Sequence, residues 1–455
     1  MSRRFHKANR SQLHLLPISI DQWLEDNHLA RFLWDCVEQF NLGQFYAAYG
    51  DEGAPPYDPQ MMLATLLYAW CLGIRSSRRI AKACEDQVPF RWLTGNIQPD
   101  HCAFARFRSR HEEAINHLFV QVLSLCHEAG LVKVGKVYLD GTKMQANGSL
   151  AANRTLAHLE QEIVKIHEEM KATDAAEDAQ HGRDRRGDEL PAELRGKGER
   201  LARLEQAKER LELAAAAERV AQEQKLAKRK EEEEQSGKKK PGRKPADADA
   251  VVNHDRKANT TDPESRIMKT RQGHVQGYNA QAIVTADQCI VSAEITQQEN
   301  DVHQLEPMLH AMEATLEVAG IDERPRKLAA DAGYWHDQLE VEQLEETGPE
   351  LFIATASRLR EGQVQQAAGS PQGRIPNDIN PKQRMTRKLR TQAGRAVYKL
   401  RSQTVEPVFG QIKSIMGCRG FLRRGLEAVQ SEWALICACF NLRKLYMAVI
   451  NQFIN

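Results

Sequence analysis

The sequence lacks the features of a secreted or membrane-spanning protein. Its longest apolar run, residues 61–73, covers 13 positions, whereas a transmembrane helix needs roughly 20. The first residues, MSRRFHK, lead into polar sequence without the apolar stretch of a secretory signal. We therefore expect a cytoplasmic chain with no membrane partner.

The cysteine patterns of disulfide-rich and zinc-binding proteins are also missing. The chain has nine cysteines, an odd number, and no CxxC pair. Cys437 and Cys439 form only a CxC inside an apolar stretch, which favours core packing. These features indicate a reduced chain with neither a disulfide framework nor a zinc site.

A strong net charge is absent because opposed blocks of charge cancel. The chain has 63 Lys and Arg residues against 62 Asp and Glu residues, which argues against a histone-like polycation. Residues 261–356 carry a net charge of −12, and residues 357–455 carry +12. An acidic block beside a basic block suggests an enzyme that acts on a polyanion with metal ions. The alternative is that both blocks are solvated faces that pair with each other.

The length of 455 residues predicts two or three domains. Helical periodicity extends from the amino terminus to about residue 130, and one helix begins at Pro59 with Asp58 as its N-cap. A β-branched strand over residues 132–139 ends in Asp140. The later elements alternate between strands and helices. Strands are predicted at 278–285, 290–295, 327–330 and 351–354, a loop at 361–385, and helices at 303–318, 386–416 and 427–449.

Residues 151–260 differ in composition from the rest of the chain, since 48 of the 110 are charged. Apolar residues step through this region at the spacing of a coiled-coil seam. The first seam is Leu159, Ile163, Ile166 and Met170, and the second, weaker one is Leu201, Leu204 and Leu211. We predict a helical hairpin. Because seams this short are only marginally stable alone, we expect the hairpin to pack against another part of the protein or to stay mobile.

Three acidic residues are candidates for metal chemistry. Asp140 and Asp331 each follow a predicted strand, and Glu406 lies among the 17 cations of the basic block. Hard cations take oxygen ligands from carboxylates, so this set suits metal-dependent phosphoryl transfer. Each residue also has a purely structural explanation. The two aspartates precede glycine-containing turns, and Glu406 could pair with Arg401 or Lys413 on a helix surface.

Seven motifs occur in one order along the chain. They are GIRSSRR at 73–79, PDHCAFARFR at 99–108, LDGTK at 139–143, TDPESR at 261–266, QGYNAQ at 276–281, ADAGY at 330–334 and YKLRSQTVEPVFGQIK at 398–413. Together they resemble the DDE transposases of bacterial insertion sequences, specifically the branch with a helical N-terminal domain. The resemblance covers nearly the whole chain.

The resemblance implies an α+β, or mixed, fold class. An all-helical N-terminal domain would precede a ribonuclease-H-like α/β core that a coiled-coil-like helical insertion interrupts. Residues 1–130 would form the DNA-binding domain and residues 131–150 the first core strand with the first catalytic aspartate. Residues 151–260 would form the insertion, and residues 261–455 the rest of the core with the C-terminal helices.

The resemblance also implies an activity. The chain would bind terminal inverted repeats, cleave DNA at the transposon ends and transfer the 3′-hydroxyl to target DNA by two-metal phosphoryl transfer. Asp140, Asp331 and Glu406 would be the catalytic triad and the ligands of two Mg²⁺ ions, for which Mn²⁺ can substitute. Its partners would be double-stranded DNA and a second copy of the chain in a homodimeric synaptic complex on the nucleoid. Two alternatives stay open: a nuclease of the same fold without strand transfer, and a transposase-derived DNA-binding protein without catalysis.

Contacts to DNA are expected in two regions. By resemblance, Tyr398, Arg401 and Lys413 would contact phosphate near the cleaved end. Arginines of the predicted N-terminal domain are candidates for terminal-repeat recognition, with ordinary solvated helix faces as the alternative. They are Arg75, Arg78, Arg79, Arg106 and Arg108.

The third-acid motif departs from the family pattern in one respect. Four residues separate Arg401 from Glu406, where the family has three. One extra residue rotates a helical side chain by about 100°. Pro407 is also unusual in a helix interior, so we expect Glu406 near a helix start or at a kink.

Overall fold

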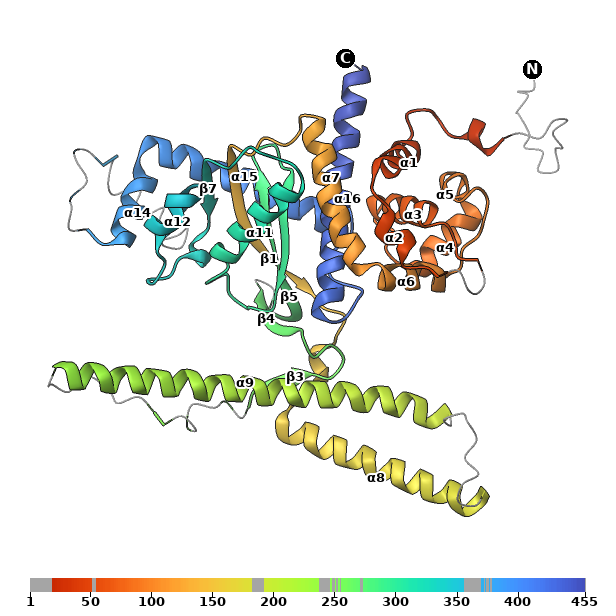
Figure 1. Ribbon diagram of the computed structural model, residues 1–455, viewed down its shortest axis with the longest axis horizontal. Coiled ribbons are helices and arrows are strands. Elements are labelled where there is room, and N and C mark those ends of the chain that lie inside the picture. The colour runs from red at the N-terminus through yellow and green to blue at the C-terminus, as the bar shows by residue number, and fades with distance from the viewer. Residues whose placement is uncertain are drawn as a thin grey trace, which may run out of the picture.

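The computed structural model describes residues 19–50, 55–181, 192–236, 255–270, 273–355 and 379–454, with isolated positions between 246 and 376. The protein is mixed α/β. A group of short N-terminal helices and a six-stranded sheet lie on either side of the long helices α7 and α16, and a pair of long helices, α8 and α9, lies apart from both (Figure 1).

The N-terminal helices form as their capping residues and apolar faces predict. Asp58 accepts a hydrogen bond from the Gln60 N–H at 3.2 Å, and Pro59 occupies the first helical position of α3, as predicted. Every α3 residue except Gln60 is buried. The elements of this region are η1 (Ile20–Trp23), α1 (Leu29–Gln39), α2 (Gly43–Ala47), α3 (Pro59–Cys71), α4 (Ser77–Asp86), α5 (Val88–Leu93), α6 (His101–Arg110) and α7 (Glu112–Glu128).

The sheet is built around β1 (Lys136–Gln145). On one side β1 pairs antiparallel with β5 (Gly273–Thr285), which pairs antiparallel with β6 (Ile290–Thr296) and β4 (Arg266–Thr270). On the other side β1 runs parallel to β7 (Lys327–Ala330), which is parallel to β8 (Glu350–Ile353). The spatial order is β6-β5-β1-β7-β8, with β4 beside the other end of β5.

Two predicted strands have wrong boundaries: the strand expected over 278–285 begins at Gly273, and the strand expected over 132–139 is shifted. β1 was expected to end at Asp140, but it continues to Gln145. The Asp-Gly pair is not a turn, because Asp140 lies opposite Ala282 and Gly141 opposite Gln281 in the antiparallel ladder. Asp140 therefore lies in the middle of a strand.

Helices of the C-terminal part pack against the sheet. α15 (Gln392–Ser414) contacts β1, β5, β7 and β8, whereas α11 (Leu305–Val318) and α16 (Leu426–Ile454) contact β6. The helix predicted over 386–416 is two helices, because α14 (Pro381–Arg390) ends at Thr391. α14 begins five residues earlier than expected, with Asn380 and Gln383 forming a capping box. The remaining elements of this part are η3 (Ala332–Tyr334) and α12 (Val341–Thr347).

α16 is long and apolar enough to cross a membrane by length and composition alone. However, 61% of its most apolar window is buried inside the protein. It packs on α7, β6 and α3, so it is placed as the core helix of a globular fold would be. Cys437 and Cys439 lie on it, both buried, in line with the predicted core packing.

Two separate hydrophobic clusters hold the chain together. The larger runs without a break from the N-terminal helices through the sheet to α16. The smaller belongs to the region that we call the arm, residues 153–259, which follows the short η2 (Leu150–Ala152). The arm consists of β2 (Asn153–Thr155), α8 (Leu156–His181), α9 (Ala192–Ser236) and β3 (Lys257–Asn259). Its cluster contains the predicted seam residues Leu159, Ile166, Leu204 and Leu211.

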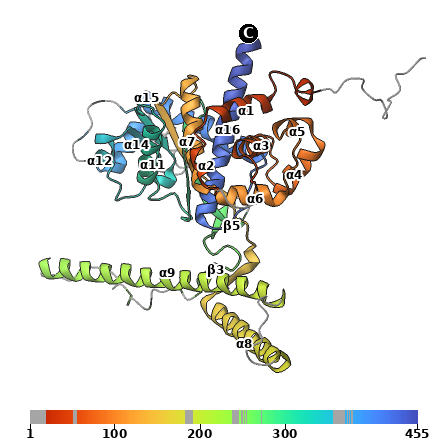
Figure 2. The ribbon, with the colours of Figure 1, turned by 45° about the vertical axis from the view of Figure 1, so that its right-hand side comes forward.

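The arm enters the chain between β1 and β4. β2 and β3 pair antiparallel, with Thr155 opposite Lys257, so its two ends leave the core side by side. α9 has 45 residues and is therefore about 68 Å long. In two views turned by 45°, α8 and α9 stay below the sheet and the N-terminal helices (Figure 2).

Candidate active site

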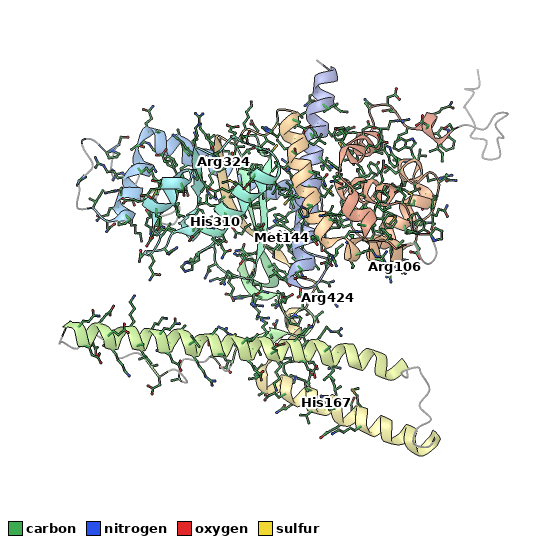
Figure 3. All side chains as sticks on the ribbon, in the orientation of Figure 1. Arg106, Met144, His167, His310, Arg324 and Arg424 are labelled. Atoms are coloured by element: carbon green, nitrogen blue, oxygen red, sulfur yellow. The ribbon has the colours of Figure 1, made fainter. Side chains whose placement is uncertain are left out.

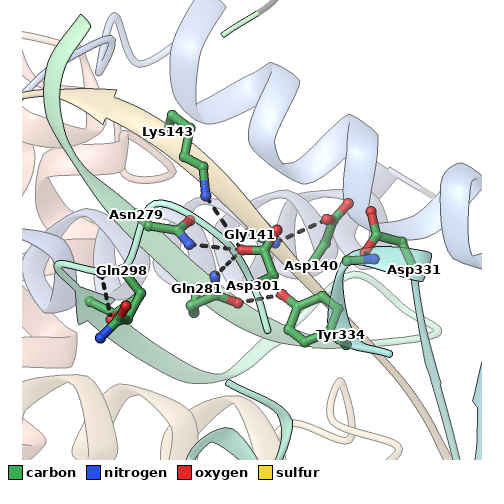
Figure 4. A network of polar contacts seen from close by, with 11 residues as sticks. Asp140, Gly141, Lys143, Asn279, Gln281, Gln298, Asp301, Asp331 and Tyr334 are labelled. Carbon is green, nitrogen blue, oxygen red and sulfur yellow. Dashed lines mark hydrogen bonds and ion pairs between the residues drawn. The ribbon is translucent and has the colours of Figure 1, made fainter. Parts of the chain in front are cut away.

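Two aspartates lie on neighbouring parallel strands. β1 and β7 pair with Tyr138 opposite Ala329, so Asp140 and Asp331 each follow two residues later. Adjacent strands are about 4.8 Å apart, and the two side chains lie close together in the site (Figure 4). Parallel pairing thus brings together two acids that are 191 positions apart in the sequence.

The environment of Asp140 destabilises its negative charge. Burial raises the pKa of Asp140 to about 6; the Arg401 guanidinium opposes that shift, and the negative charge of Asp331 adds to it. The Asp140 Oδ1 accepts a hydrogen bond from the Gly141 N–H at 2.9 Å, and its Oδ2 lies 2.9 Å from Arg401 Nη1. The charged form of a carboxylate in such an environment becomes more stable when a cation binds, because the cation compensates for the lost solvation.

Asp331 is fixed by a local turn. It caps η3, and its Oδ1 accepts a hydrogen bond from the Gly333 N–H at 2.8 Å. The turn after β7 therefore holds the carboxylate beside Asp140.

A third acid of the site, Asp301, was not predicted. It lies between β6 and α11, and its Oδ1 accepts hydrogen bonds from Asn279 Nδ2 at 2.7 Å and Gln281 Nε2 at 2.8 Å (Figure 4). Lys143 Nζ lies 3.5 Å from the same oxygen. The negative charge of Asp301 also contributes to the raised pKa of Asp140. The available signal was the pair of amides at 279 and 281, two polar residues on one face of β5.

Glycine at position 141 makes room for this network. A Cβ atom there would lie 2.3 Å from Gln281 Nε2 and 2.7 Å from Asp301 Oδ1. Tyr334, fully buried, donates a hydrogen bond to Gln281 Oε1 and ties the network to η3. Glycine is therefore needed at position 141 because side chains of the network pack against the backbone there, and not because the chain turns.

α15 carries two of the predicted accessory residues to β1. Arg401 pairs with Asp140, and Lys413 Nζ donates hydrogen bonds to Thr142 Oγ1 and, at 3.2 Å, to the Lys143 carbonyl. The ring of Tyr398 lies 5.9 Å from the Arg401 guanidinium carbon. The three residues thus gather next to the aspartates.

Glu406 does not join the aspartates in this structure. Its side chain is exposed, whereas Arg401, Thr404, Val405 and Val408 on α15 are buried. Five residues along a helix turn a side chain by about 140°, so the residue that faces Asp140 is Arg401. Within the described ranges, no group of three or more Asp, Glu, His or Cys side chains is arranged to hold a metal ion.

Of the two placements expected for Glu406, a helix start or a kink, the helix start is wrong. α15 begins at Gln392, and Pro407 lies inside it. Thr391 supplies the N-cap much earlier, by accepting a hydrogen bond from the Gly394 N–H. The helix therefore accommodates proline in its interior.

The five N-terminal arginines divide into two groups. Arg75 donates a hydrogen bond to the Gly420 carbonyl at 2.8 Å and lies 3.8 Å from Glu432, and Arg108 donates to Ser77 Oγ at 3.0 Å. The side chain of Arg75 thus joins the N-terminal region to the C-terminal part of the chain, and that of Arg108 joins α6 to α4. The other three, Arg78, Arg79 and Arg106, are exposed, and Figure 3 labels Arg106 on the N-terminal group of helices.

Two family models match the chain. A transposase domain (DUF772) matches residues 18–110, and a transposase DDE domain matches residues 371–446. The first covers most of the N-terminal helices, and the second covers α14, α15 and most of α16. No curated protein and no solved structure matches.

Proposed function

From these two matches, which support an insertion-sequence DDE transposase, we propose a complete transposition reaction. The chain binds the terminal inverted repeats, cuts DNA at the transposon ends and joins the freed 3′-hydroxyl to target DNA. The observation that carries this proposal is the pair Asp140 and Asp331 on neighbouring parallel strands. Two carboxylates beside a helix rich in cations suit in-line attack on a phosphodiester.

The proposed core is ribonuclease-H-like. Support comes from the strand order β6-β5-β1-β7-β8, in which the first three strands are antiparallel and the last two run parallel to β1. The arm is then an insertion after the first strand of that core. The N-terminal helices are the proposed DNA-binding part.

The aspartates fit a divalent cation. Both offer carboxylate oxygens, which are hard ligands, and the negative charges of Asp140 and Asp331 repel each other. DDE transposases use divalent metal ions, and we propose Mg²⁺ here. A bound ion would activate the attacking oxygen and stabilise the leaving oxygen. Arg401 and Lys413 supply positive charge next to the phosphate that is cut.

Glu406 is the proposed third ligand. Because it is exposed and about 140° around the helix from Arg401, this role requires α15 to rearrange when DNA and metal bind. Release of the Arg401–Asp140 ion pair is then part of forming the active site.

Single substitutions test the proposal. Asp140→Ala and Asp331→Ala should each abolish Mg²⁺-dependent cleavage of a plasmid that carries the gene with its flanking DNA, while DNA binding survives. Asp322 is exposed and precedes β7, whereas Asp331 follows the other end of that strand, so Asp322→Ala is the matched control. Cleavage by Asp140→Ala at the wild-type rate would contradict the assignment.

The two alternatives predict different results. A nuclease without strand transfer would cut but would not join pre-cut ends to a plasmid in Mg²⁺. A transposase-derived binding protein would bind DNA but would show no metal-dependent cleavage or joining. A homodimer that pairs two ends is part of the proposal and predicts joint products that contain both ends.

A further inference from the structure

A pocket where the arm meets the core gathers positive charge. It has a volume of about 460 Å³ and is lined by Arg210 of α9, Arg256 and Lys257 at β3, and Arg266 of β4, among polar neighbours such as Gln276. The TDPESR motif at 261–266 ends in one of these arginines and has no role in the aspartate site. We propose that this pocket binds phosphate groups of the DNA backbone, which extends the proposed function to a specific substrate contact.

The two inner arginines donate their hydrogen bonds to neutral acceptors. Arg210 donates hydrogen bonds to the carbonyls of Pro263 and, at 3.1 Å, Ser265. Arg266 donates to the Glu264 carbonyl and to Gln297 Oε1, each at 2.7 Å. Within the described part of the chain, neither forms a salt bridge. The carboxylates that act on them, Asp262 and Glu264, are not part of the pocket lining.

The arginines also act on each other. Burial lowers the pKa of Arg210 to about 9, with further lowering by Arg266 and Arg256, and burial lowers the pKa of Arg266 to about 10. Half-buried cations that repel each other are unfavourable unless an anion binds. Arg256 pairs with Glu218, and the exposed Glu299 lies at the rim. The lining itself, with four cations against Glu299, therefore carries an excess of positive charge that a phosphate would neutralise with charge-assisted hydrogen bonds.

The pocket is well placed relative to the aspartates. Arg266 lies opposite Gly277 of β5, which lies opposite Gln145 of β1, five residues from Asp140. At about 3.3 Å per residue this is about 17 Å along the strand, or about five base pairs of a duplex. A second hollow at the same end of β1 is lined by Arg419 and Arg424, and Arg424 lies between the core and the arm (Figure 3). DNA that is cut at the aspartates can thus reach the base of the arm.

The salt dependence of DNA binding tests the proposal. The dissociation constant of a random-sequence 30-base-pair duplex is measured against KCl concentration for the full chain. Each lost phosphate contact should reduce the slope of the logarithmic plot by about one. We expect a reduction of about two for Arg210→Gln/Arg266→Gln, and of about one for the exposed Lys257→Gln. Arg324→Gln/Arg326→Gln removes two exposed charges just before β7 and should leave the slope unchanged.

A second measurement separates phosphate binding from arm docking, because Arg210 also joins α9 to the carbonyls of the core. Inorganic pyrophosphate, at matched ionic strength, should raise the thermal unfolding midpoint of the wild type and of the control, but not of the Arg210→Gln/Arg266→Gln variant. If that variant does not fold, Lys257→Gln decides through its slope.

The outcomes distinguish this inference from the proposed function. A wild-type slope in both pocket variants overturns the phosphate site and leaves cleavage at the aspartates intact. Asp140→Ala should keep the full slope, because it removes catalysis and no phosphate contact. A wild-type protein that binds no duplex overturns both proposals.

Discussion

At the scale of the residue, Asp301 is the common acceptor of the polar side chains that pack against β1 at Gly141. Asp301→Ala would leave the Asn279 and Gln281 amides and the Lys143 ammonium without their common acceptor. Buried donors without partners cost about 1–3 kcal/mol. We expect urea unfolding to show a loss of that order, and the rate of metal-dependent cleavage to fall with unchanged DNA affinity.

An exposed acid nearby provides the control for this substitution. Asp337→Ala removes the same charge from a residue that follows η3 and is exposed, so stability and cleavage should stay at wild-type values. Wild-type cleavage by Asp301→Ala would contradict a positioning role for that residue.

Glu294 of β6 links stability to pH. Burial raises its pKa to about 7 from the ordinary value of 4.5. The folded state therefore holds this proton up to about pH 7, and the unfolded state releases it near pH 4.5, so the wild type loses stability between these values. Glu294→Gln lacks this loss. Its advantage in free energy of unfolding should grow from pH 5 to pH 7.5, up to about 3 kcal/mol.

A remote glutamate is the control for that measurement. Glu317→Gln changes an exposed residue of α11 and should follow the wild-type pH profile. A Glu294→Gln profile parallel to the wild type would show that this carboxylate is not desolvated.

At the scale of the element, α15 combines a functional face with an unfavourable proline. Pro407 cannot donate the backbone hydrogen bond to the Gln403 carbonyl, and proline in a helix interior costs about 3 kcal/mol relative to alanine. Pro407→Ala should therefore raise the midpoint of urea unfolding. If Glu406 reaches the site through rearrangement of α15, the stiffer helix should also cut DNA more slowly. A variant that is more stable and cuts at the wild-type rate would show that α15 does not need to rearrange.

Elements with strong local signals were predictable from sequence. The strand at 327–330 is β7 to the residue, and α3 starts where Asp58 and Pro59 indicate. The end of β1 was not, because an Asp-Gly pair usually marks a turn and only the pairing with β5 keeps this one extended.

The candidate site was partly predictable for the same reason. Asp140 lies within β1 and Asp331 follows β7, two strands with recognisable sequence patterns, so both could be proposed as site residues from the sequence. Asp301 lies in a connection whose local sequence gives no sign of the Asn279 and Gln281 amides that it meets. The orientation of Glu406 depends on which face of α15 packs on the sheet, a tertiary property that spacing does not encode.

At the scale of the whole molecule, the opposed charge blocks pair with each other in part. Lys388 of α14 in the basic block lies 2.7 Å from Glu345 and 3.2 Å from Glu350 of the acidic block. Arg401 of the basic block pairs instead with Asp140 of β1, which lies outside the acidic block. The alternative, in which the two blocks only pair with each other, therefore accounts for the contacts of α14 but not for the Arg401–Asp140 pair of α15.

The separate hydrophobic cluster of the arm predicts that the rest of the chain folds without it. Because Thr155 and Lys257 are opposite each other in β2 and β3, a two-residue Asn-Gly turn can replace residues 156–256 and close a hairpin. We expect this chain to unfold cooperatively and to nick DNA in Mg²⁺, because both aspartates and α15 remain. Its salt slope should fall, since Arg210 is gone, and gel analysis of paired ends should show impaired synapsis. Loss of nicking by the folded deletion variant would show instead that the arm contributes to catalysis.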